Sequence, residues 1–203
     1  IAELFARSCD GMAILDLHAP AVLEDMEFPV KFVSAMPEVA ERLANVVKPD
    51  FILSPDKGAI SRATEVANLI GCEFSYLEKT RIDAHTIEHT PKDLDVNGKV
   101  VAIVDDMIST GGTICRASDA LRRQGAKEVH ACCSHPVLSG PAGDRISNSP
   151  IKSVVTTNSI PLNDELKKNS KIKVLSVAPL LGEAILRIHQ ETSVSSLFDS
   201  TKD

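Results

Sequence analysis

The sequence predicts an α/β protein built on a parallel sheet that is covered by helices on both faces. Residues 100–104 form a Val- and Ile-rich run that is apolar at every position, as in strands buried on both faces. Residues 113–124 follow with apolar side chains at helical spacing. Short apolar runs and helical patterns alternate along the rest of the chain, which is typical of a parallel sheet.

The first half of the chain begins with an amphipathic helical pattern at residues 1–7 and an apolar strand from Met12. A helix is expected at 37–47, where Pro37 occupies the first turn. A short apolar strand from Phe51 then enters a polar loop, and Gly71 closes a helix at 61–70.

The second half continues the alternation. A strand ends at residues 76–81 and opens a polar run of nearly twenty residues, which in a compact domain indicates a lid or another functional loop. After the strand and helix at 100–124, strands are expected near 128–134, 151–156 and 172–177, and a helix at 179–189.

The amino-acid composition excludes several classes of function. With 203 residues, 43% apolar and 25% charged, the chain can bury one full core and part of another. A net charge of −6, 3% aromatic residues and no basic stripe argue against nucleic-acid binding. No apolar run is long enough to span a membrane, so we expect a cytoplasmic protein. Five cysteines without a C-x-x-C pair fit reduced thiols, with Cys132 and Cys133 on opposite faces of one strand.

The loop at 105–113 carries the strongest chemical signal. Gly111 and Gly112 allow positive φ and close approach of a ligand, and the free N–H groups of the next helix favour a phosphate. Hydroxyl groups nearby can add hydrogen bonds, and two carboxylates can accept them from ribose hydroxyls or bind Mg²⁺. These side chains belong to Ser109, Thr110, Thr113, Asp105 and Asp106. The loop fits neither a P-loop nor a dinucleotide motif, and a generic strand-to-helix turn is the alternative.

Three other segments place polar residues at strand ends. Alternation would put Asp16 and His18 on one face, where they could bind a cation or a nucleotide phosphate. The second segment is the polar loop with Asp56, Lys57 and Gly58. In the third, Lys79 and Arg81 would project together if their strand continues that far, and could stabilise a diphosphoryl group.

These four segments, in this order, resemble the ribose-phosphate diphosphokinases (phosphoribosyl diphosphate synthases). The loop at 105–113 alone is shared with the type I phosphoribosyltransferases. The resemblance covers nearly the whole chain and implies a type I phosphoribosyltransferase-like fold. Ser109 stands where many bacterial members have an acid, which we interpret as an archaeal-type feature; its hydroxyl could still cap the helix.

The resemblance implies a reaction in which the diphosphoryl group of Mg-ATP is transferred to the C1 hydroxyl of ribose 5-phosphate. The loop residues Asp105, Asp106, Ser109, Thr110, Gly111, Gly112 and Thr113 would bind ribose 5-phosphate. Asp56, Lys57 and Gly58 would form the pyrophosphate loop, and His18 and Asp56 would hold Mg²⁺. Asp16 and His18 would lie near the nucleotide, and Lys79 and Arg81 would be catalytic. A homo-oligomer is also implied.

The family has two similar domains, and this suggests how the chain is organised. We expect residues 1–28 to be the remnant of the first domain, 29–192 to form the second, and 193–203 to be a tail that returns to the first. Since the chain starts at Ile1 without an initiator Met, we expect a fragment that holds the ribose-phosphate half of the site better than the ATP half.

Two other functions remain open. A phosphoribosyltransferase would use the same loop to consume the sugar diphosphate, and would have no need of Asp16 and His18. A non-catalytic regulatory partner of the synthase would keep the fold and lose function at the lid. The presence of both Lys79 and Arg81 argues against that partner.

Overall fold

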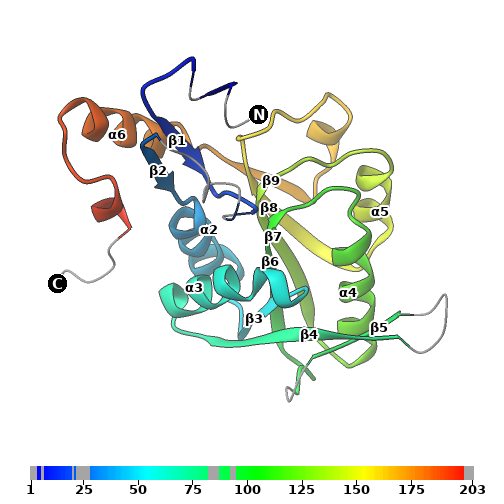
Figure 1. Ribbon diagram of the computed structural model, residues 1–203. Helices are drawn as coiled ribbons and strands as arrows, with labels where there is room; N and C mark the ends of the chain where they lie inside the picture. The colour runs from blue at the N-terminus through cyan, green and yellow to red at the C-terminus, as the bar shows by residue number, and fades with distance from the viewer. Residues whose placement is uncertain are drawn as a thin grey trace. The chain divides into compact units, whose positions relative to one another are not determined.

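The computed structural model describes residues 4–5, 7–19, 21, 28–81, 87–91 and 95–198 (Figure 1). The chain divides into two compact units. The larger unit comprises residues 36–176, and the smaller comprises residues 1–35 together with 177–203.

The larger unit is built on a seven-stranded sheet with the order β5-β4-β3-β6-β7-β8-β9. Every neighbouring pair is parallel except β4 and β5, which are antiparallel. The strands are β3 (Phe51–Ser54), β4 (Glu73–Arg81), β5 (Ile87–Pro91), β6 (Val100–Met107), β7 (Glu128–His135), β8 (Ile151–Thr157) and β9 (Ile172–Leu175).

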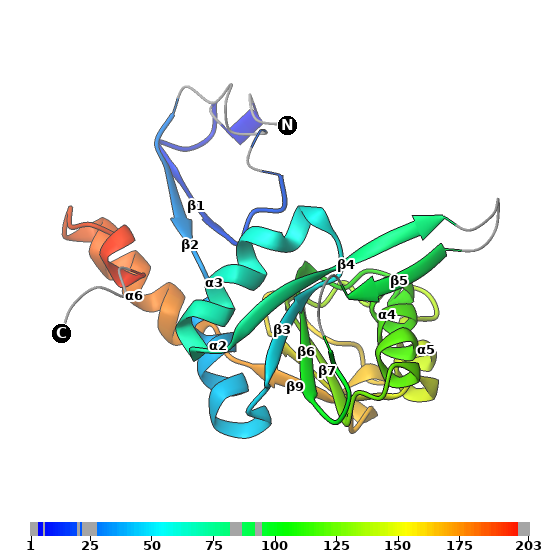
Figure 2. The same cartoon turned by 90° about the horizontal axis from the view of Figure 1, so that it is seen from below.

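Helices cover both faces of this sheet, because its central strands are apolar on both sides. In β6, Val101 and Ile103 join one core with α4 (Gly112–Arg123) and α5 (Ala142–Asn148). Ala102 and Val104 join the other core with α2 (Met36–Arg42) and α3 (Ile60–Ile70). Figures 1 and 2 show the two helix pairs on opposite sides of the strands, which confirms the predicted fold class.

The two adjacent cysteines of β7 show the same alternation. Cys133 lies in the core that contains α4, and Cys132 lies in the core that contains α2. All five cysteines are free thiols, and burial raises the pKa of Cys133 to about 12. The prediction of opposite faces is therefore confirmed. No helix among the described residues is both long enough and apolar enough to cross a membrane.

The strand order reverses direction between β3 and β6. From β3 the chain moves outward to β4, returns on the other side of β3 as β6, and then proceeds away through β7 and β8. In open α/β sheets, ligands bind at the carboxyl ends of the strands beside such a reversal. The loops that follow β3 and β6 flank this point.

The smaller unit contains two parallel strands, β1 (Met12–Leu15) and β2 (Val30–Val33), the helix α6 (Ala178–His189) and a 3₁₀ turn (Ser195–Leu197). Val33, Leu180 and Val194 share its core. The boundary at 35–36 differs from the one expected at 28, because β2 pairs with β1. The helix α6 joins this unit, although the sequence placed it in the second domain.

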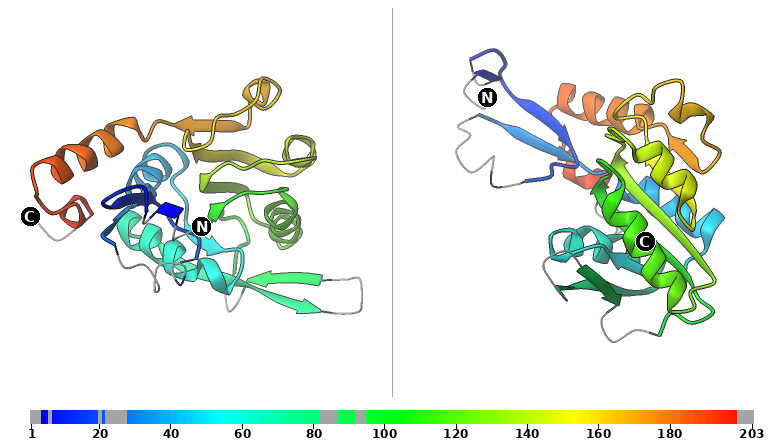
Figure 3. Two further views of the ribbon diagram at one scale, coloured as in Figure 1. Left: turned by 45° about the horizontal axis from the view of Figure 1, so that its top comes forward. Right: turned by 90° about the vertical axis from the view of Figure 1, so that its right-hand side faces the viewer.

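One prediction about local structure was wrong. The polar run after β4 is not structureless, because β5 pairs with β4 to form the hairpin visible in Figure 3. The helix expected at 37–47 is confirmed: it comprises α2 and a last turn, Leu43–Val47, that is π-helical. Lys48, with φ of 53°, ends that turn.

Candidate functional site

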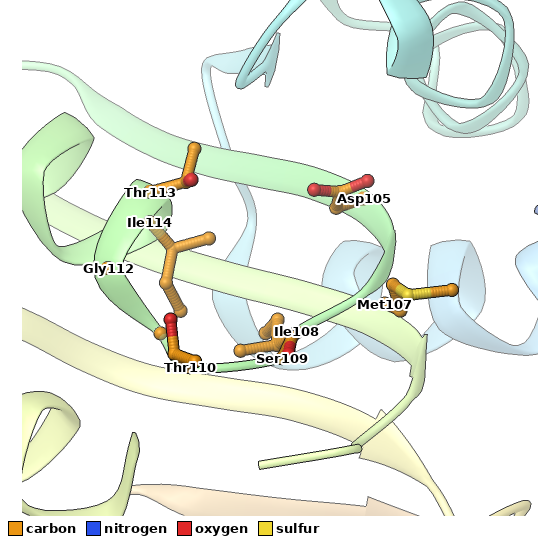
Figure 4. Close-up of a pocket in the computed structure, with 9 residues that line it drawn as sticks. Asp105, Met107, Ile108, Ser109, Thr110, Gly112, Thr113 and Ile114 are labelled. Carbon is orange, nitrogen blue, oxygen red and sulfur yellow. The ribbon is translucent and has the colours of Figure 1, made fainter. Parts of the chain in front are cut away.

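A small pocket lies in the loop that joins β6 to α4 (Figure 4). The chain curves from Asp105 on the strand to Thr113 in the first turn of the helix. The pocket measures about 140 Å³, several times the roughly 30 Å³ that one water occupies in the liquid. It is lined by Asp105, Met107, Ile108, Ser109, Thr110, Gly111, Gly112, Thr113 and Ile114. Six of the seven residues expected to bind ribose 5-phosphate are therefore brought together.

The backbone of this loop offers hydrogen-bond donors. Gly111 precedes the helix with φ of 72°, a conformation that L side chains rarely adopt. In the described part of the chain, the N–H groups of Gly111, Gly112 and Thr113 have no acceptor. The positive end of the α4 dipole lies at the same place. This arrangement suits an anion such as a phosphate.

The loop is held in place by the loop that follows β7. Ile108 N donates to His135 O at 3.1 Å, and Leu138 N donates to Ile108 O at 2.9 Å. Ser139 N donates to Ser109 O at 3.1 Å, and the two serine hydroxyls are 3.5 Å apart. Ser109 does not cap the helix, because the capping position belongs to Gly111. That expectation was wrong.

Two arginines lie near the loop. Arg145 on α5 donates from Nη1 to Thr110 O at 2.9 Å. A Cβ on Gly112 would lie 3.2 Å from Nη1 of Arg116, one turn along α4, and 3.5 Å from Nη1 of Arg145. Neither arginine was predicted: Arg145 reaches the loop only through tertiary structure, whereas Arg116 could have been found from its helical spacing to Gly112.

The two adjacent acids have different surroundings. Asp105 lines the pocket, whereas Asp106 is 1% exposed and does not line it. Asp106 Oδ2 lies 3.4 Å from Nη2 of Arg62 on α3, another residue that the sequence analysis missed. Burial, the hydrogen bond to Asp106 and the negative charges of Asp106 and Asp56 together raise the pKa of Asp105 to about 7. Asp106 carries the charge that pairs with Arg62.

The loop after β3 satisfies its own polar groups. Asp56 Oδ1 accepts from Gly58 N at 3.0 Å, and Ser54 Oγ donates to the carbonyl of Asp56. Lys57 and Gly58 are exposed. The effect of Asp56 on the pKa of Asp105 shows that the two loops are electrostatically linked.

The backbone places Lys79 and Arg81 two residues apart in β4. Lys79 is opposite His89, and Arg81 is opposite Ile87. The strand β4 therefore extends to Arg81, which is the condition for Lys79 and Arg81 to project together. The side chains of these two residues lie outside the described part of the structure.

Asp16 and His18 belong to the smaller unit. The strand β1 ends at Leu15, and Asp16 has φ of 41°, so strand alternation does not place these two side chains on one face. Asp16 Oδ2 accepts from Ala35 N at 2.9 Å, which explains the turn. The alternation on which the shared face was predicted therefore stops at Leu15. His18 is exposed.

Comparison with known proteins gives a consistent result. The phosphoribosyl synthetase-associated domain matches residues 84–199, more than half of the chain. The ribose-phosphate pyrophosphokinase of Oceanobacillus iheyensis is 43% identical over 201 residues, covering 98% of this chain and 63% of that protein. The Bacillus subtilis ribose-phosphate pyrophosphokinase is also 43% identical, with 97% and 64% coverage.

A solved structure agrees with these sequence matches. The crystal structure of phosphoribosylpyrophosphate synthetase from Mycobacterium smegmatis superimposes with a TM-score of 0.82 and 31% identity. The match covers 92% of this chain and 61% of that one. The chain thus spans less than two thirds of the length of the relatives it matches.

Proposed function

Because the chain belongs to the phosphoribosyl synthetase-associated domain family, we propose that it serves as the ribose-phosphate-binding part of a ribose-phosphate diphosphokinase. The reaction transfers the diphosphoryl group of Mg-ATP to ribose 5-phosphate and gives 5-phosphoribosyl 1-diphosphate and AMP. The observation that carries this proposal is the pocket between β6 and α4, whose backbone N–H groups surround space for a phosphate.

The 5-phosphate binds to the N–H groups of Gly111, Gly112 and Thr113, with hydroxyls from Ser109 and Thr110 beside it. Preformed donors at a helix N-terminus favour the dianion without rearrangement. Asp105, at the strand end of the same pocket, accepts hydrogen bonds from the ribose hydroxyls through its carboxyl oxygens. Asp106 does not line the pocket and supports the site indirectly, since its ion pair with Arg62 holds the end of β6 against α3.

The transfer breaks one bond and forms another. The C1 hydroxyl oxygen attacks the β-phosphorus, the bond from this phosphorus to the oxygen bridging the α-phosphate breaks, and the hydroxyl proton leaves to solvent. Such a transfer needs positioning and charge neutralisation more than covalent help from the protein. Lys79 and Arg81 supply two cations that stabilise the charge developing on the transferred group.

The acidic residues fit a metal that arrives with the nucleotide. Mg²⁺ is usually held by one or two carboxylates together with substrate phosphates. No group of three potential ligands was found among the described residues. In the larger unit, Asp56 is the proposed ligand. For the smaller unit, the family resemblance alone implies that His18 binds the metal and that Asp16 lies near the nucleotide. When bound, Mg²⁺ neutralises phosphate charge.

The remaining partners follow from this activity. ATP and ribose 5-phosphate are the proposed substrates, with the loop of Asp56, Lys57 and Gly58 taking the diphosphate. We place the protein in the cytoplasm, where nucleotide precursors are made, and expect it to work as a homo-oligomer.

The experiment incubates the protein with Mg²⁺, ATP and ribose 5-phosphate, and separates AMP from ADP. AMP with a sugar diphosphate supports the proposal. Conversion of added sugar diphosphate and a free base to a nucleotide would instead indicate a phosphoribosyltransferase. If the protein is expressed from its full coding sequence, ribose 5-phosphate binding without turnover would indicate the regulatory partner. Lys79→Ala should lower turnover by orders of magnitude and spare sugar binding, and unchanged turnover would remove Lys79 from catalysis.

A further inference from the structure

The guanidinium of Arg145 makes a single contact that controls the direction of one peptide group. Its Nη1 donates to the carbonyl oxygen of Thr110 at 2.9 Å. Among the described residues, the Arg145 guanidinium makes no other hydrogen bond or ion pair, and the backbone N–H of Arg145 donates to Pro141 O within its own helix turn. Its helix is anchored independently, because Ala142 and Ile146 are buried in the core. Arg145 therefore extends from a fixed base to the outer side of the loop.

A trans peptide places its C=O and N–H on opposite sides. When the carbonyl of Thr110 points to Arg145, the N–H of Gly111 must point away from it. That N–H has no acceptor in the described part of the chain. The bond to Arg145 thus determines whether the loop presents a donor or an acceptor at this position.

The loop needs such a lock, because Gly111 permits both orientations. Its φ of 72° and ψ of −2° match the third residue of a type II turn. Flipping the preceding peptide converts a type II turn to type I, and glycine is stable in both. The flip would bring the Thr110 carbonyl, with its partial negative charge, toward the bound anion.

We propose that Arg145 is a positioning residue that locks the Thr110–Gly111 peptide with its N–H directed at the 5-phosphate of the sugar. The inference rests on the proposed function, since it assumes a phosphate in this loop. The guanidinium also polarises the peptide, because a hydrogen bond from a charged donor strengthens the N–H on the other side.

Three variants of the 203-residue chain test the lock by calorimetric titration with ribose 5-phosphate. Arg145→Met removes the donor and should weaken binding by about tenfold, whereas Arg145→Lys keeps a charged donor and should stay within about threefold of the wild type. Arg123→Met is the matched control, because Arg123 is an exposed arginine in the last turn of α4. It should bind like the wild type.

Amide NMR distinguishes a lock from general support of the loop. In the wild type, ribose 5-phosphate should shift the Gly111, Gly112 and Thr113 amide signals. In Arg145→Met the Gly111 response should disappear while the other two remain. Equal loss at all three amides, or unchanged affinity in Arg145→Met, would overturn the inference. A wild type that does not bind ribose 5-phosphate would overturn the proposed function, and the inference with it.

Discussion

The loops after β3 and β6 lie at the ends of neighbouring parallel strands, yet they satisfy their backbone in opposite ways. After β3, Asp56 bonds to Gly58 two residues later, within the loop itself. After β6, the loop is tied from outside by the backbone beyond β7 and by Arg145. The first loop is self-contained, whereas the second is held by its neighbours.

This difference shows what a backbone phosphate site requires. The loop after β3 commits the Gly58 N–H to its own Asp56 carboxylate and exposes the side chain of Lys57. A loop whose carbonyls are bound from outside can leave consecutive N–H groups open. We infer that the loop after β3 contributes charged side chains to ligand binding, and that the loop after β6 contributes a fixed set of backbone N–H groups.

The largest expected effect is the loss of stability when the ion pair between the two regions is broken. Arg62, on the helix after the first loop, pairs with Asp106 on the strand before the second. Arg62→Met would leave a buried carboxylate without this partner and should lower the free energy of unfolding by about 3 kcal/mol. Urea unfolding measures it. The double variant with Asp106→Asn should recover most of the loss, and a loss below about 0.5 kcal/mol would show that the pair does not hold the regions together.

The next prediction compares substitutions at Gly111, in the loop after β6, and at Gly58, in the loop after β3. Gly111→Val forces a β-branched side chain into a left-handed conformation, which costs about 1–2 kcal/mol. Because the same change displaces the open N–H groups, ribose 5-phosphate affinity should fall about a hundredfold, or about 2.7 kcal/mol. Gly58→Ala is the control, since its Cβ would meet only Asp56 Oδ1, at 3.3 Å. Calorimetry should find it within about threefold of the wild type, and equal losses would erase the distinction.

Asp105 makes the stability of the folded protein depend on pH. Its pKa is raised from 3.8 to about 7, so the folded protein keeps a proton that the unfolded chain loses from about pH 4 upward. The stability that this proton provides is therefore present below about pH 4 and is lost as the pH rises to about 7. Asp105→Asn keeps a neutral side chain at all pH values.

Thermal unfolding of Asp105→Asn and the wild type at two pH values checks this sign. The two proteins should be similarly stable at about pH 3.5, below the pH at which the carboxyl of the unfolded chain ionises. At about pH 8 the variant should be more stable by about 1–3 kcal/mol, below the limit of about 4 kcal/mol set by the pKa. A stabilisation that is the same at both pH values would contradict the assignment of the proton to Asp105.

The smallest expected effect is a change in the pKa of Asp105 when the charge of Asp56 in the other loop is removed. Asp56→Asn removes a charge that raises the pKa of Asp105, so that pKa should fall by less than about one pH unit. Carboxyl ¹³C NMR titration follows Asp105 directly. The amide of the variant can still accept from Gly58 N, so the loop should keep its shape. A rise in the pKa would mean that Asp56 acts on Asp105 in some other way.

The parts of the site that could be predicted from sequence are those encoded locally. The run from Val100 to Thr113 contains its own strand, turn and helix start, and the glycines mark the bend. Arg62 and Arg145 could not be found, because each reaches the loop from a helix distant in sequence. The lid prediction overlooked β5, whose pairing with β4 is set by tertiary contact more than by composition. Strand alternation does not reach Asp16, because β1 ends at Leu15 and the Asp16 carboxylate accepts from Ala35 N.

A crystal structure of the protein with ribose 5-phosphate would locate the phosphate site. We expect the 5-phosphate oxygens within hydrogen-bond distance of the N–H groups of Gly111, Gly112 and Thr113, with the Thr110 carbonyl still bonded to Arg145. A phosphate bound instead at Lys57 and Gly58, with the loop after β6 empty, would contradict this expectation.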